Sequence, residues 1–144
     1  MGTTVSDVLK IKGHQVVTVT PEQTLASVAS ILTENRIGAA PVVDHSGRLV
    51  GIISERDLVR GIAERGPAAL SMPNQQLMTK EVSTCAPGDQ VVTLMEVMTN
   101  RRIRHLPVVQ GGGLAGIVSI GDVVKQRLAE AQFELDELRR YISS

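Results

Sequence analysis

The feature of this sequence that most constrains its fold is an internal duplication. Residues 18–44 align with residues 84–110 without a gap, and the eight identical pairs include Pro21 with Pro87 and Ile37 with Ile103. After a loop that is one residue shorter in the second copy, residues 51–59 align with residues 116–124, where five of nine positions are identical. Agreement of this density indicates two copies of one structural unit within the chain of 144 residues.

Each copy begins with the same succession of local patterns. A short β-branched run, at 16–19 or 82–85, ends at a proline turn. A helix follows, with Thr24 or Asp89 as its candidate N-cap. Its apolar face recurs at i, i+3, i+4 and i+7, and consists of Leu25, Val28, Ala29 and Leu32 in the first copy and Val91, Leu94, Met95 and Met98 in the second.

The rest of each copy predicts a hairpin and a second helix. A strand starts at Pro41 or Pro107, because the first residue of a strand need not donate a hydrogen bond. Turns at 44–47 and 110–113 join it to a strand over 49–54 or 114–119. The second helix begins at Asp57 or Asp122. The expected fold is therefore α/β (α+β), with two β-α-β-β-α repeats packed sheet to sheet with pseudo-two-fold symmetry, since a copy of roughly 60 residues buries too small a core alone.

The last helix continues well past the repeat. Its apolar residues step by 4, 3, 4, 3 and 4 along the chain, which is the narrow stripe of a coiled-coil seam; they are Val124, Leu128, Ala131, Leu135, Leu138 and Ile142. The stripe could cover its own module or pair with a second chain. Because the first copy has nothing comparable, a homodimer is favoured. The expected units are 5–65, 75–127 and a helical extension over 128–144.

Composition weighs against several classes of partner. Fifteen basic and fifteen acidic residues cancel, so the chain lacks the positive field with which proteins attract nucleic acid or anionic lipid. No apolar run approaches the ~20 residues that cross a bilayer, so no membrane partner is expected. The single cysteine, Cys85, excludes an internal disulfide, and together with His14, His45 and His105 it shows no zinc-ligand spacing. We therefore expect a cytoplasmic protein without a metal.

A Ser-x-x-Asp box recurs in both copies where a strand meets a helix. Ser54 with Asp57, and Ser119 with Asp122, place a hydroxyl and a carboxylate there. A carboxylate can accept hydrogen bonds from both hydroxyls of a ribose, and the adjacent helix N-terminus offers free N–H groups to a phosphate. The alternative is that each box only caps its helix. Two boxes in register in a duplicated cleft favour ligand binding.

The quoted motifs carry a resemblance to a known family. Each Pro-Val-Val strand leads through a turn into Gly-Ile-Ile-Ser-Glu-Arg-Asp at 51–57 or Gly-Ile-Val-Ser-Ile-Gly-Asp at 116–122. This pattern resembles the CBS domain, and two in tandem resemble a Bateman module, over about Val5 to Lys125. The chain is similar to stand-alone bacterial CBS-pair proteins of the signal-transduction type. The resemblance implies a sensor, not an enzyme, that binds AMP, ADP, ATP or NAD(H) between the copies and signals to an effector protein, with modules pairing into discs.

The resemblance also implies that residues of both copies hold each ligand. One predicted site is centred on Asp122 and comprises Thr18, Ile37, Gly38, Ala39, Ser119, Gly121 and Asp122. The other is centred on Asp57 and comprises Ser54, Arg56, Asp57, Thr84, Ile103, Arg104 and His105. The strand edges at 37–39 and 103–105 would contact adenine. No catalytic residue is implied.

The two predicted sites are not equivalent. Arg56, Arg104 and His105 are candidates for binding phosphate, because guanidinium groups match phosphate oxygens bidentately. They could instead belong to an exposed basic cluster with the arginines at 101 and 102. Gly121 stands where the first copy has Arg56. This difference leaves open whether the Asp122 site prefers a mononucleotide or a nicotinamide dinucleotide.

Other ligands and functions fit less well. S-adenosylmethionine or a single-stranded nucleic acid could occupy the same cleft, although no aromatic ring lies near the basic cluster to stack on bases. Residues 116–121 resemble the nucleophile elbow of hydrolases, but Ile117 stands where that turn needs glycine. His105 could be imagined as a base, yet the first copy has Ala39 in its place, so a hydrolase is not favoured.

Overall fold

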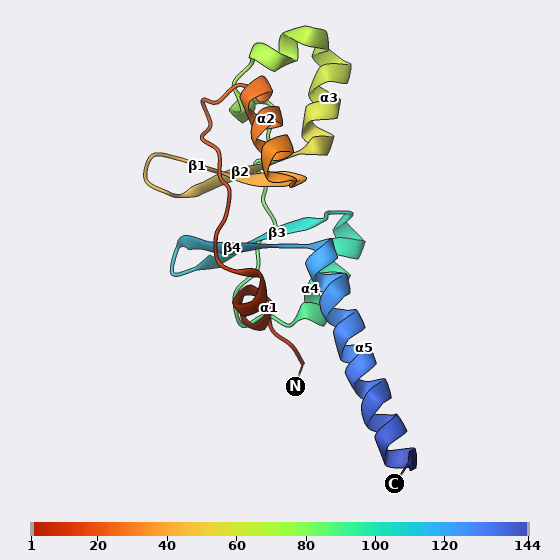
Figure 1. The fold of residues 1–144 in the computed structure, drawn as a ribbon. Helices are drawn as coiled ribbons and strands as arrows, with labels where there is room; N and C mark the ends of the chain where they lie inside the picture. The colour runs from red at the N-terminus through yellow and green to blue at the C-terminus, as the bar shows by residue number, and fades with distance from the viewer. Residues whose placement is uncertain (1, 144) are drawn as a thin grey trace.

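The structure, a computed structural model, describes residues 2–143. Two short antiparallel sheets lie one above the other in the middle of the molecule, and the helices lie outside them (Figure 1). The first sheet pairs β1 (Ala39–Val43) with β2 (Leu49–Ser54), and the second pairs β3 (His105–Gln110) with β4 (Gly113–Ser119). The predicted packing of two repeats sheet to sheet is confirmed.

Helices cover the outer face of each sheet. They are α2 (Leu25–Asn35) and α3 (Glu55–Arg65) on the first sheet, and α1 (Val5–Lys12), α4 (Val91–Arg101) and the start of α5 (Ile120–Ser143) on the second (Figure 1). Two short 3-10 helices, Gly66–Ser71 and Asn74–Gln76, lead from the first copy to the second. The predicted apolar faces are confirmed, because the buried residues of α2 and α4 are Leu25, Val28, Leu32, Val91, Leu94 and Met98.

The first strand predicted for each copy is an extended segment with a single parallel bridge. Val19 bridges to Val42, and Cys85 bridges to Val108. In the first copy the Val19 N–H donates to the Pro41 carbonyl at 3.0 Å, and the Val43 N–H donates to the Val19 carbonyl at 2.9 Å. The next bond along this ladder would need an N–H on Pro41, which proline lacks. The prolines therefore limit the outer strand to one bridge.

The hairpins form where predicted, but their first strands begin two residues earlier. β1 starts at Ala39 and β3 at His105, so Pro41 and Pro107 are the third residues of their strands and not the first. Their missing N–H groups face the outer edge that carries only the single bridge, so the hairpin loses no hydrogen bond. The turn of the second hairpin contains Gly111 and Gly112 at φ of 60° and 80°, a conformation that glycine adopts without steric cost.

The second helix of each copy also begins two residues before the predicted start. α3 begins at Glu55 and α5 at Ile120, so Asp57 and Asp122 are the third residues of their helices. The reason is that each aspartate bonds back to the serine that precedes the helix, which is the geometry of a capping box. The sequence pattern alone predicts the aspartate as the first residue of the helix.

Of the two predicted N-caps of the first helices, one is confirmed and one is wrong. The Thr24 hydroxyl accepts a hydrogen bond from the Ser27 N–H at 3.2 Å and caps α2. Asp89 does not cap α4. Its carboxylate accepts the Ala86 N–H at 2.8 Å in the preceding turn, and Gln90 occupies the N-cap position without a side-chain bond.

Each sheet has a hydrophobic core of its own, and the N-terminal helix belongs to the second one. Val5, Val8 and Leu9 of α1 are buried among residues of α4, β3, β4 and α5. The helix approaches β4 so closely that a Cβ on Gly116 would lie 2.8 Å from Leu9 Cδ2. Thus α1 precedes the first copy in sequence but completes the core of the second.

Candidate functional site

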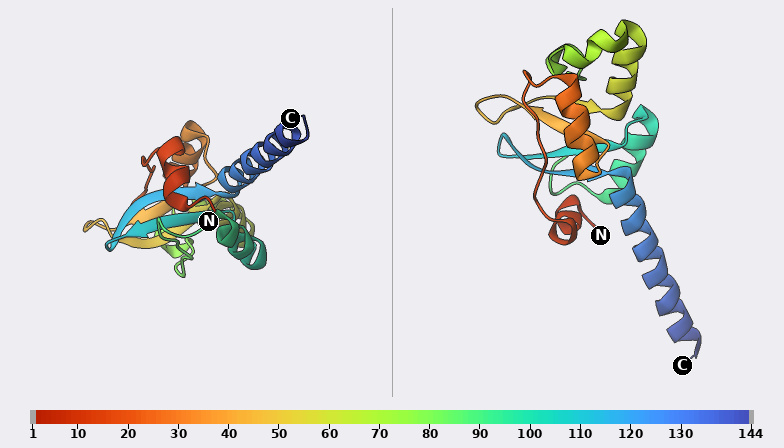
Figure 2. Two further views of the ribbon diagram at one scale, coloured as in Figure 1. Left: turned by 90° about the horizontal axis from the view of Figure 1, so that it is seen from below. Right: turned by 45° about the horizontal axis from the view of Figure 1, so that its top comes forward.

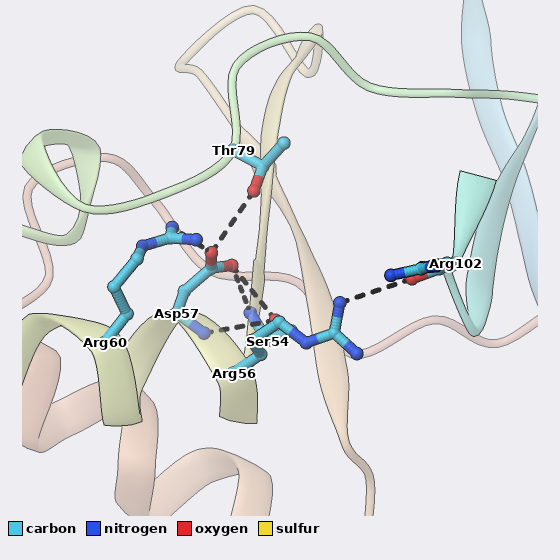
Figure 3. A network of polar contacts seen from close by, with 6 residues as sticks. All are labelled: Ser54, Arg56, Asp57, Arg60, Thr79 and Arg102. Atoms are coloured by element: carbon cyan, nitrogen blue, oxygen red, sulfur yellow. Dashed lines mark hydrogen bonds and ion pairs between the residues drawn. The ribbon is translucent and has the colours of Figure 1, made fainter.

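Asp57 is the centre of a polar network at the start of α3 (Figure 3). One carboxylate oxygen accepts the Ser54 N–H at 2.9 Å and the Ser54 hydroxyl at 3.1 Å. The other oxygen accepts Arg60 at 2.5 Å and the Thr79 hydroxyl at 3.2 Å. The residue is 2% exposed. The box is therefore a helix cap whose aspartate uses its second oxygen to accept hydrogen bonds from Arg60 of the same helix and from Thr79 outside it.

Asp57 lines a cavity of about 490 Å³ between the two copies. A volume of this size is in the range of small-molecule sites. Six of the seven residues predicted for the Asp57 site line it, namely Ser54, Arg56, Asp57, Ile103, Arg104 and His105. The seventh, Thr84, does not line this cavity. The preceding residues Glu81, Val82 and Ser83 do so instead, because the segment that leads into the second copy passes the cavity before it reaches Thr84.

Arginines from both copies line this cavity, together with two glutamates. Arg56 extends from the first turn of α3 towards the end of α4, where its Nη1 donates to the Arg102 carbonyl at 3.3 Å (Figure 3). Within residues 2–143, the guanidinium groups of Arg102 and Arg104 form no hydrogen bond or ion pair with the protein. These two groups are available to an anion, and they face the same cavity as the Asp57 carboxylate.

The sequence reasoning missed two residues of the Asp57 network. Arg60 follows Asp57 by three residues on a helix, a spacing at which side chains meet, so this ion pair could have been found from the sequence. Thr79 is separated from Asp57 by 22 residues and lies outside the aligned repeats. No pattern in the sequence marks it as a partner of Asp57.

The second box has the same local geometry and a different outer partner. The Ser119 N–H donates to Asp122 at 2.9 Å, and the Asp122 N–H donates to the Ser119 hydroxyl at 3.1 Å. The ammonium of Lys12, from the last turn of α1, lies 2.6 Å from the Asp122 carboxylate and 2.8 Å from the Ile117 carbonyl. Burial disfavours charge on Asp122, but the hydrogen bonds from Lys12 and Ser119 outweigh it and lower the pKa of the carboxyl group.

The other residues predicted for the Asp122 site are dispersed. Gly38 and Ala39 line the cavity beside Asp57. Ile37, together with Gly38, lines a shallow groove between α2 and α3. Thr18 and Gly121 are exposed, and neither lines the Asp57 cavity or this groove. The structure thus brings six residues of the predicted Asp57 site together, but not those predicted around Asp122.

His105 lies between the two boxes. A Cβ on Gly38 would be 3.4 Å from Cε1 of its imidazole, so the small residue of one copy makes room for the large residue of the other. Burial and the nearby charge of Lys12 lower the pKa of His105, and the carboxylates of Glu55 and Asp122 oppose this shift. The imidazole is therefore held in its neutral form at neutral pH.

The structure thus consists of two copies of one α/β unit with a cavity between them, and comparison with known proteins identifies the family. The model of the CBS domain matches residues 5–64 and again residues 75–129. The chain therefore belongs to the CBS domain family and carries a tandem CBS pair. In this family such pairs are regulatory ligand-sensing modules.

Several relatives are similar over most of their length. The mitochondrial CBS domain-containing protein CBSX3 of Arabidopsis thaliana is 38% identical, with 97% of this chain and 72% of the relative aligned. The crystal structure of the CBS-domain-containing protein ATU1752 from Agrobacterium tumefaciens superposes with a TM-score of 0.85 at 46% identity, covering 88% of this chain and 95% of that one.

A further solved structure contains ligands. The CBS domain pair of protein MJ0100, in complex with 5-methylthioadenosine and S-adenosylmethionine, has a TM-score of 0.76 at 27% identity. The match covers 85% of this chain and 98% of that one.

Within residues 2–143, no helix is both long enough and apolar enough to span a membrane.

Proposed function

We propose that this CBS pair is a sensor that binds one adenine nucleotide in the cavity at Asp57. The observation that carries the proposal is the juxtaposition in that cavity of a carboxylate that can accept ribose hydroxyls and three guanidinium groups that can bind phosphate. The Ile103 strand edge and Ala39 would contact the adenine. The complex of MJ0100 with two adenosine derivatives supports a ligand of this class.

The bonding of Asp57 suggests how a ribose would enter. The Thr79 hydroxyl donates to the outer oxygen of the carboxylate at 3.2 Å. A ribose hydroxyl is the same kind of donor, so it can replace Thr79 on that oxygen without leaving the buried carboxylate unpaired. The cap formed with Ser54 would remain in place, since it uses the other oxygen.

The phosphate side of the cavity favours a nucleotide over a neutral or cationic adenosine derivative. The guanidinium groups of Arg102 and Arg104 have no protein partner among residues 2–143, and burying these groups against a ligand requires a compensating negative charge. AMP, ADP, ATP and NAD(H) supply such charge, whereas 5-methylthioadenosine and S-adenosylmethionine carry no phosphate. We expect dissociation constants in the micromolar range, which is the range needed to report on cellular nucleotide levels.

A second nucleotide at the Asp122 site, as predicted from the sequence, requires Lys12 to leave the carboxylate. We propose that this site is the weaker of the two. The chain would act in the cytoplasm by changing its contacts with a separate effector protein rather than by catalysis.

The decisive test is calorimetric titration of the purified chain with AMP, ATP, NADH and S-adenosylmethionine, together with mass spectrometry of any copurified ligand. We expect heat from the phosphorylated ligands, with an affinity at least tenfold above that for S-adenosylmethionine. Tighter binding of S-adenosylmethionine would assign the cavity to that ligand instead. If a single-stranded oligonucleotide alone gave a signal, the sensor proposal would be wrong.

A further inference from the structure

The C-terminal helix leaves the rest of the molecule soon after it begins. Val123 is fully buried in the second core, and the Gln126 side chain donates to the Thr3 hydroxyl at 3.2 Å. Beyond about residue 130, α5 extends away from both sheets, as two views show (Figures 1 and 2). Among the residues that the structure describes, none of the module lies beside this part of the helix (Figures 1 and 2). The predicted alternative, in which the helix covers its own module, therefore does not apply beyond residue 130.

The apolar stripe of α5 lies on exposed surface. Its larger side chains are exposed at Leu128 (65%), Leu135 (42%), Leu138 (56%) and Ile142 (74%). Successive residues of a helix are separated by about 100°, so the stripe is centred on one face while Val123, Gln126 and Glu130 point to another. The face that contacts the module and the face that carries the stripe are thus different, and the stripe is accessible to a partner.

We propose that α5 pairs with α5 of a second copy as a parallel, in-register, two-stranded coiled coil. The 4-3 spacing places Leu128, Leu135 and Ile142 at one set of core positions and Val124, Ala131 and Leu138 at the other. The partner helix is α5 of a second copy, because a two-stranded coiled coil needs a second apolar stripe of the same length and spacing, and a second copy supplies an identical one. This contact is separate from any pairing of the CBS repeats.

The charges that flank the stripe set the orientation. In a parallel coiled coil, the residue immediately before each core position of the Leu128, Leu135 and Ile142 set lies beside a residue of the partner helix. That partner residue is five positions further along the sequence. Glu134 then lies beside Arg139 of the second copy, and this attraction occurs twice in the dimer. In an antiparallel pair centred on the same stripe, Glu134 would face Glu134 and Lys125 would face Arg139. Like charges in both places disfavour that arrangement.

Disulfide trapping in the full chain tests the arrangement directly. Leu138→Cys places two thiols opposite each other only in the parallel, in-register pair, at a Cα separation that a disulfide can span. Phe133→Cys is the matched control, because Phe133 is 67% exposed on the opposite face of the same helix. The native thiol contributes little, since Cys85 is buried and its pKa is raised to about 12 by that burial and by the charge of Asp89.

We expect rapid, nearly complete dimer formation by Leu138→Cys under mild oxidation, and at least tenfold less by Phe133→Cys and by the native chain. Both substituted residues lie on the protruding part of α5, so neither change disturbs the folded module. Equal trapping at the two positions, or none at residue 138, would overturn the proposal.

Charge reversal tests the orientation by an independent measurement, the dimer dissociation constant from analytical ultracentrifugation. Glu134→Lys and Arg139→Glu should each weaken the dimer by about fivefold or more, since two exposed attractions become repulsions. The double variant should restore the native value, because the pairs then re-form with opposite polarity. In the antiparallel pair Arg139→Glu would replace the repulsion from Lys125 by an attraction, so an Arg139→Glu chain that dimerises more tightly would show that the helices are antiparallel.

Discussion

The two Ser-x-x-Asp boxes have matching local geometry and different outer contacts. In both, a serine and an aspartate exchange hydrogen bonds at the start of a helix. Asp57 then accepts Arg60 and the Thr79 hydroxyl at the wall of a cavity, whereas Asp122 is bound by the Lys12 ammonium. The duplicated sequence fixes the cap. Residues outside the aligned repeats decide what the free side of each carboxylate can bind.

The difference has a second component in the phosphate-binding groups. The first box contains Arg56, which reaches the backbone of Arg102 across the cavity. The second contains Gly121 at the equivalent position, and the nearest cation, Lys12, is already paired with the carboxylate. We therefore expect the two halves to respond very differently to matched substitutions.

The largest expected effect comes from Asp57→Ala. This change removes the ribose acceptor, and charged hydrogen bonds of about 1.5 to 3 kcal/mol each correspond to a loss of affinity of roughly 10-fold to 150-fold. It also removes the carboxylate that accepts the Ser54 N–H, which is one half of the capping box, so the free energy of unfolding should fall by about 1 kcal/mol. Calorimetry and chemical denaturation measure the two effects.

Asp122→Ala is the matched control for that experiment. It removes the equivalent residue of the other box, so it should leave the affinity at the Asp57 cavity within about twofold while abolishing any second binding event. If Asp122→Ala weakened the main binding event as much as Asp57→Ala does, the assignment of the cavity to Asp57 would be wrong.

A smaller effect is expected from Lys12→Met, which removes the cation that holds Asp122. The ion pair is partly exposed, so its loss should cost less than about 1 kcal/mol of stability. The freed carboxylate should bind the ribose of unphosphorylated adenosine about two- to fivefold more tightly at the second site. The carboxyl pKa of Asp122 should also rise, because a hydrogen bond that lowers it is lost. NMR titration of the carboxyl carbon follows that shift, and an unchanged pKa would contradict it.

The smallest expected effect is a pH dependence caused by His105, whose counterpart in the first copy is Ala39. Its pKa is lowered from 6.5 in the folded chain by burial and by Lys12. Between the folded and unfolded pKa values the unfolded chain binds more protons, so stability falls as the pH drops through 6.5 and levels off below the folded pKa.

Replacing His105 with asparagine should flatten this part of the stability profile. His45→Asn is the control, because His45 is an exposed residue of a hairpin turn. Denaturant unfolding at pH 5 and pH 7 makes the comparison. Equal slopes for the native chain and His105→Asn would assign the dependence to another group.

The parts of the molecule that were predictable from sequence are those with local or repeated signals. The stripe of Leu25, Val28 and Leu32 identifies a buried helical face because its period is fixed by helix geometry. The box containing Asp57 was recognisable because it occurs twice. The Asp89 cap was predicted wrongly because aspartate is equally suited to the turn before a helix, where it bonds to Ala86.

The parts that were not predictable depend on distant contacts. Lys12 and Asp122 are separated by 110 residues, and nothing in the composition around Lys12 distinguishes it from any other surface lysine. Thr79 is equally unmarked. Such contacts follow from how the segments that precede each repeat cross the molecule, and a pattern search within the repeats does not sample them.

The position of α1 has a consequence for how the chain is made and folded. Its side chains Val5 and Leu9 belong to a hydrophobic core whose members outside α1 all lie between Cys85 and Val123 in the sequence. During synthesis this helix emerges before either repeat, yet the second repeat must be made before the apolar face of α1 can be covered. Contacts of such long sequence separation form late because closing the intervening loop costs entropy. The first repeat can therefore collapse early, while the second cannot complete its core until α1 and residues 85–123 have come together.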